Sequence, residues 1–322
     1  MKKLVSTLLA ALLLCSLIAG CAAQTVPEAS QPAAAPASSE PAVEATPAPA
    51  EPAADPLTEA AMDYFASFPE DRHMISVADL FAKMDAGEEM LIIDVRQPDA
   101  YAEGHLKGAV NIPYGPAVAE NLEKIPDDVM IYVNCYSGQT SSQVVALLGV
   151  AGKYVTNIQG GFNGGISKTE GYEAYIETTE NTLPDESYPV DASIVSAITT
   201  YFEQAGTDSF SSFNISVDAL NELVEAESEE YTILSIRKES DYQEGHIAGA
   251  INIPFGKGMQ ERFSEIPTDK PVIVYCYSGQ TASQTMAVLR MLGYKAYNLA
   301  GGTGSAEAGS GWLGKGYPLV TD

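Results

Sequence analysis

One six-residue segment occurs twice in this chain, and its two copies are identical. Cys-Tyr-Ser-Gly-Gln-Thr occupies residues 135–140 and, 141 positions downstream, residues 276–281. An apolar, β-prone run precedes each copy, at 129–133 and 272–275, and a segment with helical periodicity follows it. The pattern predicts a strand that ends at a cysteine, a turn at the glycine and a helix that opens directly after the turn.

A cysteine at such a turn is well placed for nucleophilic chemistry. The backbone N–H groups of the turn and the positive end of the helix favour an anion, so they favour thiolate over thiol. Cys135 and Cys276 are therefore the predicted nucleophiles. The alternative is that both are small buried hydrophobic residues at strand ends, as a single cysteine usually is. Repetition of the whole hexapeptide favours a function.

The similarity extends well beyond the two hexapeptides, at an offset that stays at 141 from Arg96 to Gly161. The matched segments are Ile92-Ile93-Asp94-Val95-Arg96 with Ile233-Leu234-Ser235-Ile236-Arg237, Tyr101-Ala102-Glu103-Gly104-His105 with Tyr242-Gln243-Glu244-Gly245-His246, Gly108 to Pro113 with Gly249 to Pro254, and Gly160-Gly161 with Gly301-Gly302. A period this long predicts tandem domains, because the units of solenoids span about 20–50 residues. We place the first domain at 57–188 (core 75–180) and the second at 189–322 (core 215–320).

Short apolar runs alternate with helical patterns inside each repeat. We expect strands near 91–95, 109–112, 129–134 and 154–158, helices near 77–86, 116–124 and 141–149, and a further helix after Gly161. A helical segment near 192–204 opens the second repeat. This order predicts an α/β fold in which each domain is a parallel sheet flanked by helices. It also places both cysteine loops at the carboxyl ends of strands, where such folds bind ligands.

The first 20 residues have the pattern of an export signal. Lys2 and Lys3 precede an apolar run that is too short to span a membrane comfortably. Ile18-Ala19-Gly20-Cys21 resembles a bacterial lipobox, which implies cleavage before Cys21 and lipid on its thiol. An ordinary secretory signal cut elsewhere is the alternative. We expect an extracytoplasmic protein that is anchored to a bacterial membrane through the lipid on Cys21.

Residues 21–56 are expected to form a disordered tether. From residue 22 to residue 56 there are 13 Ala, 8 Pro and five acidic residues, with neither a basic nor an aromatic side chain to build a core. Cys15 would leave with the signal and Cys21 would carry lipid, so the folded part keeps only Cys135 and Cys276. Two thiols at matching positions suit chemistry better than stabilisation by disulfides.

The charge of the chain narrows its partners. It has 17 Lys and Arg against 43 Asp and Glu, which gives a net charge of −26. Such a surface argues against nucleic acid as a partner and against electrostatic adhesion to anionic lipid.

Taken together, the repeated motifs resemble those of the rhodanese (sulfurtransferase) family, over about 75–180 and again over 215–320. The resemblance implies that each loop cysteine carries sulfane sulfur as a persulfide, taken from a donor such as thiosulfate and passed to a thiol or cyanide. It also implies that the loop amides hold the transferred sulfur and the oxyanion of the donor, and it calls for no cofactor. The loop residues concerned are Tyr136, Ser137, Gly138, Gln139 and Thr140, and Tyr277, Ser278, Gly279, Gln280 and Thr281.

Two departures from the family pattern carry predictions. Many rhodaneses end the loop with Arg, whereas Thr140 and Thr281 stand here, as in small bacterial sulfurtransferases whose loop ends in a hydroxyl residue. Loss of the bidentate arginine predicts poor use of thiosulfate and a preference for neutral or protein-bound persulfides. Ser235 replaces the aspartate expected opposite Asp94, so we expect the second domain to be the weaker sulfur acceptor.

The other marked residues have predicted structural roles: Asp94, Arg96, Glu103 and His105 in the first repeat, and Arg237, Glu244 and His246 in the second. Each arginine ends a buried strand and has a glutamate seven residues on, which predicts an internal ion pair. Each histidine follows a glycine, which is typical of a hydrogen-bonded turn residue. Three histidines with two cysteines make no convincing zinc set, so we expect no metal.

Two other functions stay open. A cysteine loop at a helix N-terminus also suits a phosphatase or arsenate reductase, but Ser141 and Ala282 stand where protein phosphatases usually supply an arginine. The chain could instead be a non-catalytic binding or sulfur-carrier module, with its cysteines inert or joined in a disulfide, which needs Cα atoms within about 7 Å. The sequence names neither the sulfur donor, nor the thiol acceptor, nor a protein partner.

Overall fold

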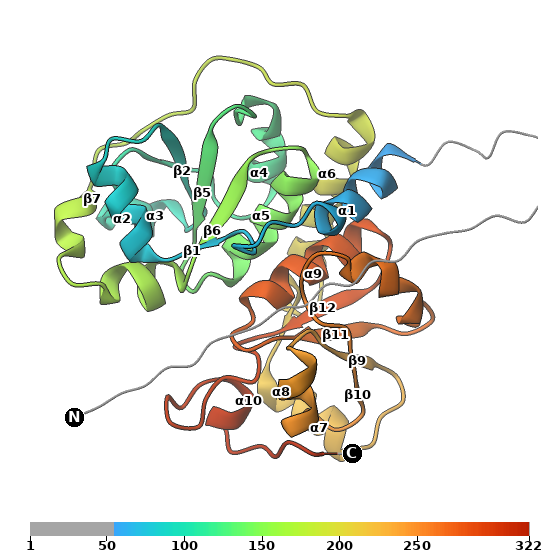
Figure 1. Ribbon diagram of the computed structural model, residues 1–322. Helices are drawn as coiled ribbons and strands as arrows, with labels where there is room; N and C mark the ends of the chain where they lie inside the picture. The colour runs from blue at the N-terminus through green and yellow to red at the C-terminus, as the bar shows by residue number, and fades with distance from the viewer. Residues whose placement is uncertain (1–54, 322) are drawn as a thin grey trace, which may run out of the picture. The chain divides into compact units, whose positions relative to one another are not determined.

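Two five-stranded parallel sheets, one in each repeat, organise the structure (Figure 1). The first has the strand order β1-β6-β5-β2-β4 and the second β8-β12-β11-β9-β10, so equivalent strands take equivalent places. The first sheet consists of β1 (Met74–Ile75), β2 (Met90–Asp94), β4 (Ala109–Asn111), β5 (Met130–Asn134) and β6 (Val155–Ile158). The second consists of β8 (Asn214–Ile215), β9 (Thr232–Ser235), β10 (Ala250–Asn252), β11 (Val272–Tyr275) and β12 (Ala296–Leu299). The predicted α/β class with two parallel sheets is confirmed.

Helices flank both sheets. In the first repeat they are α1 (Pro56–Ala66), α2 (Val77–Asp85), α3 (Pro98–Glu103), α4 (Pro116–Glu120), η1 (Leu122–Lys124) and α5 (Gln139–Val150). In the second repeat they are α6 (Ala192–Thr207), η5 (Ser211–Phe213), α7 (Val217–Glu225), α8 (Glu239–Glu244), η6 (Met259–Glu265), α9 (Gln280–Met291) and α10 (Gly311–Gly314). The helices predicted near 77–86, 116–124, 141–149 and 192–204 are present, the second of them as α4 followed by η1.

The segment after Gly161 differs from its prediction. In place of one helix it forms three short turns, the π-helical η2 (Gly161–Gly165) and the 3₁₀ turns η3 (Ile166–Lys168) and η4 (Tyr172–Tyr175). The chain then pairs β7 (Ile176–Glu177) with β3 (His105–Leu106) in a small antiparallel sheet. Glycines at 160, 161 and 171 with positive φ break the regular helical path here.

The computed structural model describes residues 55–321, and all of them fall in one compact unit. The predicted signal peptide at 1–20, the lipid site Cys21 and nearly all of the predicted tether lie outside this range. Within it, no helix combines the length and the apolar character that crossing a bilayer would need.

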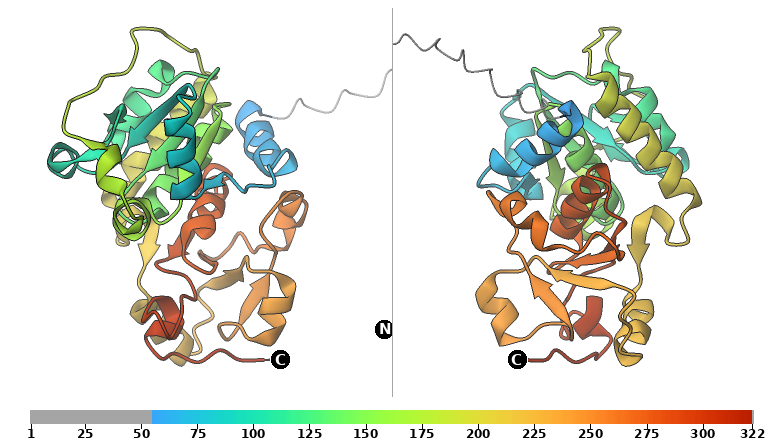
Figure 2. Two further views of the ribbon diagram at one scale, coloured as in Figure 1. Left: turned by 60° about the vertical axis from the view of Figure 1, so that its left-hand side comes forward. Right: turned by 90° about the vertical axis from the view of Figure 1, so that its right-hand side faces the viewer.

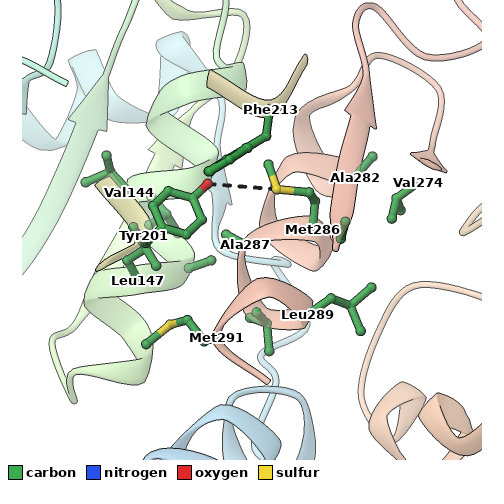
Figure 3. Close-up of a cluster of buried hydrophobic side chains, with 14 of the residues drawn as sticks. Val144, Leu147, Tyr201, Phe213, Val274, Ala282, Met286, Ala287, Leu289 and Met291 are labelled. Carbon is green, nitrogen blue, oxygen red and sulfur yellow. Dashed lines mark hydrogen bonds between the residues drawn. The ribbon is translucent and has the colours of Figure 1, made fainter. Parts of the chain in front are cut away.

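Helices α5 and α9, which follow the two cysteine loops, pack along each other. Each is buried almost from end to end, with a strand of its own sheet on one side and the other helix facing it. Val144 and Leu147 of α5 lie across from Met286 and Met291 of α9 (Figure 3). Both sheets therefore contribute to one continuous hydrophobic core, so the two domains share the free energy of its burial.

The helix that opens each repeat packs on the other repeat. Helix α1 contacts η6 and α9 of the second domain, and α6 contacts α4 of the first (Figure 2). The Phe65 ring of α1 lies edge-on to Phe255 and Phe263, at centroid distances of 5.9 and 5.8 Å. Phe202 of α6 meets Tyr114 in the same way at 5.3 Å. This exchange of helices joins the two domains in addition to the packing of α5 on α9.

Because of this exchange, a change in α1 should destabilise the second domain. Phe65 is fully buried, and Phe65→Ala is expected to lower the free energy of unfolding by about 3–5 kcal/mol. Urea unfolding is followed by the fluorescence of the single tryptophan, Trp312 in the second domain, and by far-UV circular dichroism. The urea midpoints from the two probes should shift together. Replacing the exposed Tyr154 by Ala is the control, with a change of less than about 0.5 kcal/mol. A Trp312 transition unaffected by Phe65→Ala would show that the domains unfold independently.

Candidate active site

The two cysteines lie where the central strand of each sheet ends. Cys135 follows β5, the chain turns at Gly138 with φ +83°, and α5 begins at the next residue. Cys276 follows β11 and turns at Gly279 with φ +80° into α9. A left-handed conformation suits glycine, because a side chain would be strained there. Both cysteines are buried free thiols, only 1% and 2% exposed.

Each sulfur atom lies within reach of loop amides. The N–H of Gly138 donates to Cys135 Sγ at 3.1 Å, and the N–H of Gly279 donates to Cys276 Sγ at 3.1 Å. Neither glycine can cap its helix with a side chain, so N–H groups of the first turn stay available to the sulfur. Ala282 adds its N–H at 3.4 Å from Cys276 Sγ. Both loops therefore direct backbone N–H donors at the cysteine sulfur.

The two sulfur environments differ at one position. The Ser141 hydroxyl oxygen lies 3.1 Å from Cys135 Sγ, whereas the equivalent residue in the second domain is Ala282, which has no hydroxyl. In the sequence, Ser141 stands where a protein phosphatase would supply an arginine, which by itself predicts no contact with the cysteine. Its place six residues after Cys135, in the first turns of α5, is the signal that could have placed it.

A pair of glycines packs against the backbone of each cysteine loop. The Phe162 N–H donates to the Cys135 carbonyl at 2.7 Å, and the Thr303 N–H donates to the Cys276 carbonyl at 2.9 Å. A Cβ atom on Gly161 would lie 2.5 Å from the Cys135 carbonyl oxygen. The Gly160-Gly161 and Gly301-Gly302 motifs therefore allow a close backbone approach that fixes the cysteine loop from behind.

A tyrosine follows each cysteine and is about 40% exposed. The Gln97 N–H donates to the Tyr136 hydroxyl at 3.4 Å, and the Lys238 N–H donates to the Tyr277 hydroxyl at 3.2 Å. Tyr277 also donates to Asp241, and this hydrogen bond holds the pKa of that carboxyl below its usual value. Burial, followed by the same hydrogen bond, raises the pKa of Tyr277. The rim of the second loop is thus more firmly held than that of the first.

The predicted ion pair between Arg96 and Glu103 is wrong. Arg96 forms a bidentate ion pair with Asp94 on the same strand end, with Nε–Oδ1 and Nη2–Oδ2 distances of 3.0 and 2.6 Å, and both side chains are buried. Arg96 also donates to the Gly104 carbonyl at 2.8 Å and stacks 3.9 Å from the centre of the Phe162 ring. Glu103 lies in the exposed last turn of α3. A charge at the end of a buried strand needs a buried partner, and Asp94 supplies it.

The predicted pair of Arg237 with Glu244 is also wrong. Glu244 is exposed, whereas Arg237 is buried and donates to the Gly245 carbonyl. Ser235 replaces the paired aspartate and meets only the Arg237 N–H, at 3.4 Å. Within residues 55–321 the Arg237 Nε atom has no hydrogen-bond partner. The second domain therefore holds a buried cation without the carboxylate that its counterpart has.

The histidines serve the framework near α3 and α8. His105 Nδ1 lies 2.8 Å from the Tyr101 carbonyl, and its Nε2 lies 2.9 Å from the Thr179 carbonyl. His246 Nδ1 lies 3.0 Å from the Tyr242 carbonyl. The two rings stack on those same tyrosines, at 3.6 and 4.0 Å. Over the part of the chain that the structure describes, no three His, Cys, Asp or Glu side chains are grouped to hold a metal ion.

The two cysteine loops touch across the domain interface, which sequence reasoning could not place. Gln139 Oε1 in the first loop accepts from the Gly301 N–H at 3.2 Å. Gln280 Oε1 in the second loop accepts from the Gly160 N–H at 3.0 Å. Each glutamine therefore holds the glycine pair that lies behind the opposite cysteine.

Residues 76–168 and 216–306 each match the family model of the rhodanese-like domain. The chain belongs to the rhodanese-like family. Among curated proteins it is 38% identical over 71 residues to an uncharacterized protein, YqhL, of Bacillus subtilis, a match over 22% of this chain and 56% of that protein. It is 33% identical over 96 residues to a sulfurtransferase of Allochromatium vinosum, over 30% of this chain and 83% of that one. It is 37% identical over 71 residues to the thiosulfate sulfurtransferase GlpE of Coxiella burnetii, over 22% and 65% of the two chains. The chain thus spans only about half the length of the first of these relatives.

The two rhodanese-like domains should respond oppositely to exchange of the residue beside the buried arginine. Asp94→Ser leaves Arg96 buried without a partner and should cost about 3–5 kcal/mol of the free energy of unfolding. Ser235→Asp gives Arg237 the missing carboxylate and should add about 1.5–3 kcal/mol.

Urea unfolding of the two variants measures both changes. The control is Asp128→Ser at an exposed site, which should stay within about 0.5 kcal/mol. If both substitutions shift stability in the same direction, the asymmetry between the two arginines is not electrostatic.

Proposed function

We propose that this protein is a sulfurtransferase that moves sulfane sulfur through persulfides on Cys135 and Cys276. The observation that carries the proposal is the pair of loops in which a buried thiol receives a backbone N–H at 3.1 Å, at the head of a helix that has no side-chain cap. Membership of the rhodanese-like family and relatives named sulfurtransferase and thiosulfate sulfurtransferase support it.

The proposed step is nucleophilic substitution at sulfur. The cysteine thiolate attacks the outer sulfur of a donor persulfide and forms a new S–S bond. The bond between the two donor sulfurs breaks, and the donor thiolate leaves with the electron pair. With thiosulfate the leaving group is sulfite. An acceptor thiolate then attacks the outer sulfur of the cysteine persulfide and releases the cysteine thiolate, so no external oxidant or reductant is needed.

In this mechanism the loop amides stabilise negative charge on sulfur. They donate to the cysteine sulfur before transfer and to the terminal, negatively charged sulfur of the persulfide after it. They cost no reorganisation, because the helix and the glycine turn already fix them. Arg96 near the first loop adds little to this, because Asp94 pairs with it.

The donor that this site suits best is a neutral or protein-bound persulfide. Neither loop ends in arginine, and without Lys2 and Lys3 the chain has 15 basic against 43 acidic residues, a net charge of −28. Repulsion by this surface slows the encounter with a small dianion such as thiosulfate, and added salt relieves that repulsion.

Each cysteine should accept sulfur on its own. After reduction, Cys276→Ser and Cys135→Ser are incubated with an organic persulfide or thiosulfate, and the intact mass is measured with and without reductant. We expect a reductant-sensitive gain of one sulfur in both, faster in Cys276→Ser, because Cys135 has the Ser141 hydroxyl and the paired arginine. The persulfide should load faster than thiosulfate, and the double variant should not load. If neither single variant gains sulfur, the protein is a non-catalytic module instead.

We further propose that the mature chain is extracytoplasmic and anchored through lipid on Cys21. The support is the lipobox-like Ile18-Ala19-Gly20-Cys21 and the Ala- and Pro-rich tether behind it. In fractionated cells the wild type should sediment with membranes and Cys21→Ala should not, with matching mass spectra of the N-terminal peptide. A wild-type protein recovered soluble would contradict the anchor and leave the sulfur chemistry untouched.

A further inference from the structure

Each loop glutamine uses its two amide atoms for different domains. Gln280 Nε2 donates to Ser278 of its own loop at 3.2 Å, while its Oε1 accepts from first-domain groups. Gln139 repeats this pattern, with Nε2 on Ser137 at 3.4 Å and Oε1 on second-domain groups. The contact is thus present twice, in two independent copies of the same geometry.

The connection from Gln280 continues to the sulfur of Cys135. Gln280 Oε1 accepts from Asn157 Nδ2 at 3.1 Å. Asn157 Oδ1 lies 2.6 Å from the Ser141 hydroxyl, which lies 3.1 Å from Cys135 Sγ. Asn157 and Ser141 are fully buried. Because the Ser141 hydroxyl has one proton, it donates either to Asn157 or to the sulfur, and the sulfur competes best as thiolate.

The equivalent series of hydrogen bonds, from Gln139 of the first domain towards Cys276 of the second, is interrupted. Gln139 Oε1 accepts from Asn298 Nδ2 at 3.0 Å, as the pattern requires. Ala282 then stands in place of Ser141, and among residues 55–321 the buried Asn298 Oδ1 has no hydrogen-bond partner. An unsatisfied carbonyl at this point marks where the second copy lacks its hydroxyl.

We propose that Gln280 of the second domain is a positioning residue for Cys135 of the first, acting through Asn157 and Ser141. Gln280 fixes the Asn157 amide, so that the Asn157 Oδ1 atom faces Ser141. This contact holds the Ser141 hydroxyl beside the sulfur and sets its orientation there. Gln139 supports Cys276 only through the Gly301 N–H, since its other connection ends at Asn298. The two sites are therefore coupled unequally, and the sulfur-loading part of the test rests on the proposed function.

The test compares each glutamine at the same cysteine. In the Cys276→Ser background, Gln280→Met keeps the length of the side chain but loses the acceptor. It should slow sulfur loading of Cys135 from an organic persulfide about tenfold, as expected for two buried hydrogen bonds. Gln139→Met, the matched control in the loop of Cys135 itself, should slow it less than about threefold. A larger effect of Gln139→Met would overturn the proposal, because the glutamine would then act within its own loop.

A double-mutant cycle tests the route. If the effect passes through Ser141, Gln280→Met in a Ser141→Ala variant should lose most of its effect. In the Cys135→Ser background, Ala282→Ser should speed loading of Cys276 and make it sensitive to Gln139→Met. Effects of Gln280→Met and Ser141→Ala that multiply independently would overturn the proposed route.

Alkylation of Cys135 by iodoacetamide, followed by peptide mass, gives a readout that needs no sulfur transfer. Gln280→Met should change the alkylation rate of Cys135. Gln280→Glu, which keeps an oxygen acceptor for Asn157 and Gly160, should restore that rate to within about twofold of the rate with Gln280 unchanged. A loss of stability alone would not be rescued in this way, and thermal unfolding of each variant checks it. If no variant loads sulfur but alkylation follows this pattern, the proposed function fails and the positioning role stands. If Gln280→Met and Gln280→Glu alkylate alike, the positioning role fails.

Discussion

Helices α5 and α9 pack together because each has its own sheet on one side and meets the other helix on the opposite side. Their side chains are buried almost throughout, so neither helix turns a full face to water. Since both helices begin directly after a cysteine loop, their packing also brings the two loops into contact. The shared core, the exchanged α1 and α6, and the glutamine contacts all follow from this one pairing.

Much of the fold could be predicted from the repeat and from the period of its apolar residues. The strands near 91–95, 109–112, 129–134 and 154–158 lie within one residue of their predicted ends, because buried parallel strands are nearly continuous apolar runs. The cysteine loops were equally clear, since a strand, a glycine and a helix in fixed order define such a turn. The structure of the segment after Gly161 could not be predicted in this way, because glycines with positive φ values replace a regular helix by short turns there.

What the sequence could not supply was the choice of partners in space. Asp94 precedes Arg96 by two residues and Glu103 follows it by seven, and the longer spacing favours Glu103 as the partner. The structure pairs Arg96 with Asp94 instead, because both of these side chains are buried. Nothing local to Phe65 or Phe202 indicates that they pack on the opposite repeat. The role of Asn157 is likewise invisible in sequence, since its neighbours Ser141 and Gln280 lie 16 and 123 residues away.

The reciprocal glutamine contacts make the interface between the repeats self-complementary, like that of a symmetric dimer whose two subunits have been joined into one chain. In such an interface one residue type serves two purposes, since it belongs to one loop and completes the other. The identity of the two hexapeptides then has a geometric reason in addition to a chemical one. A substitution of either glutamine changes the opposite site as well as its own loop, whereas Ser141 and Ala282, whose side chains stay within their own domains, differ between the two copies.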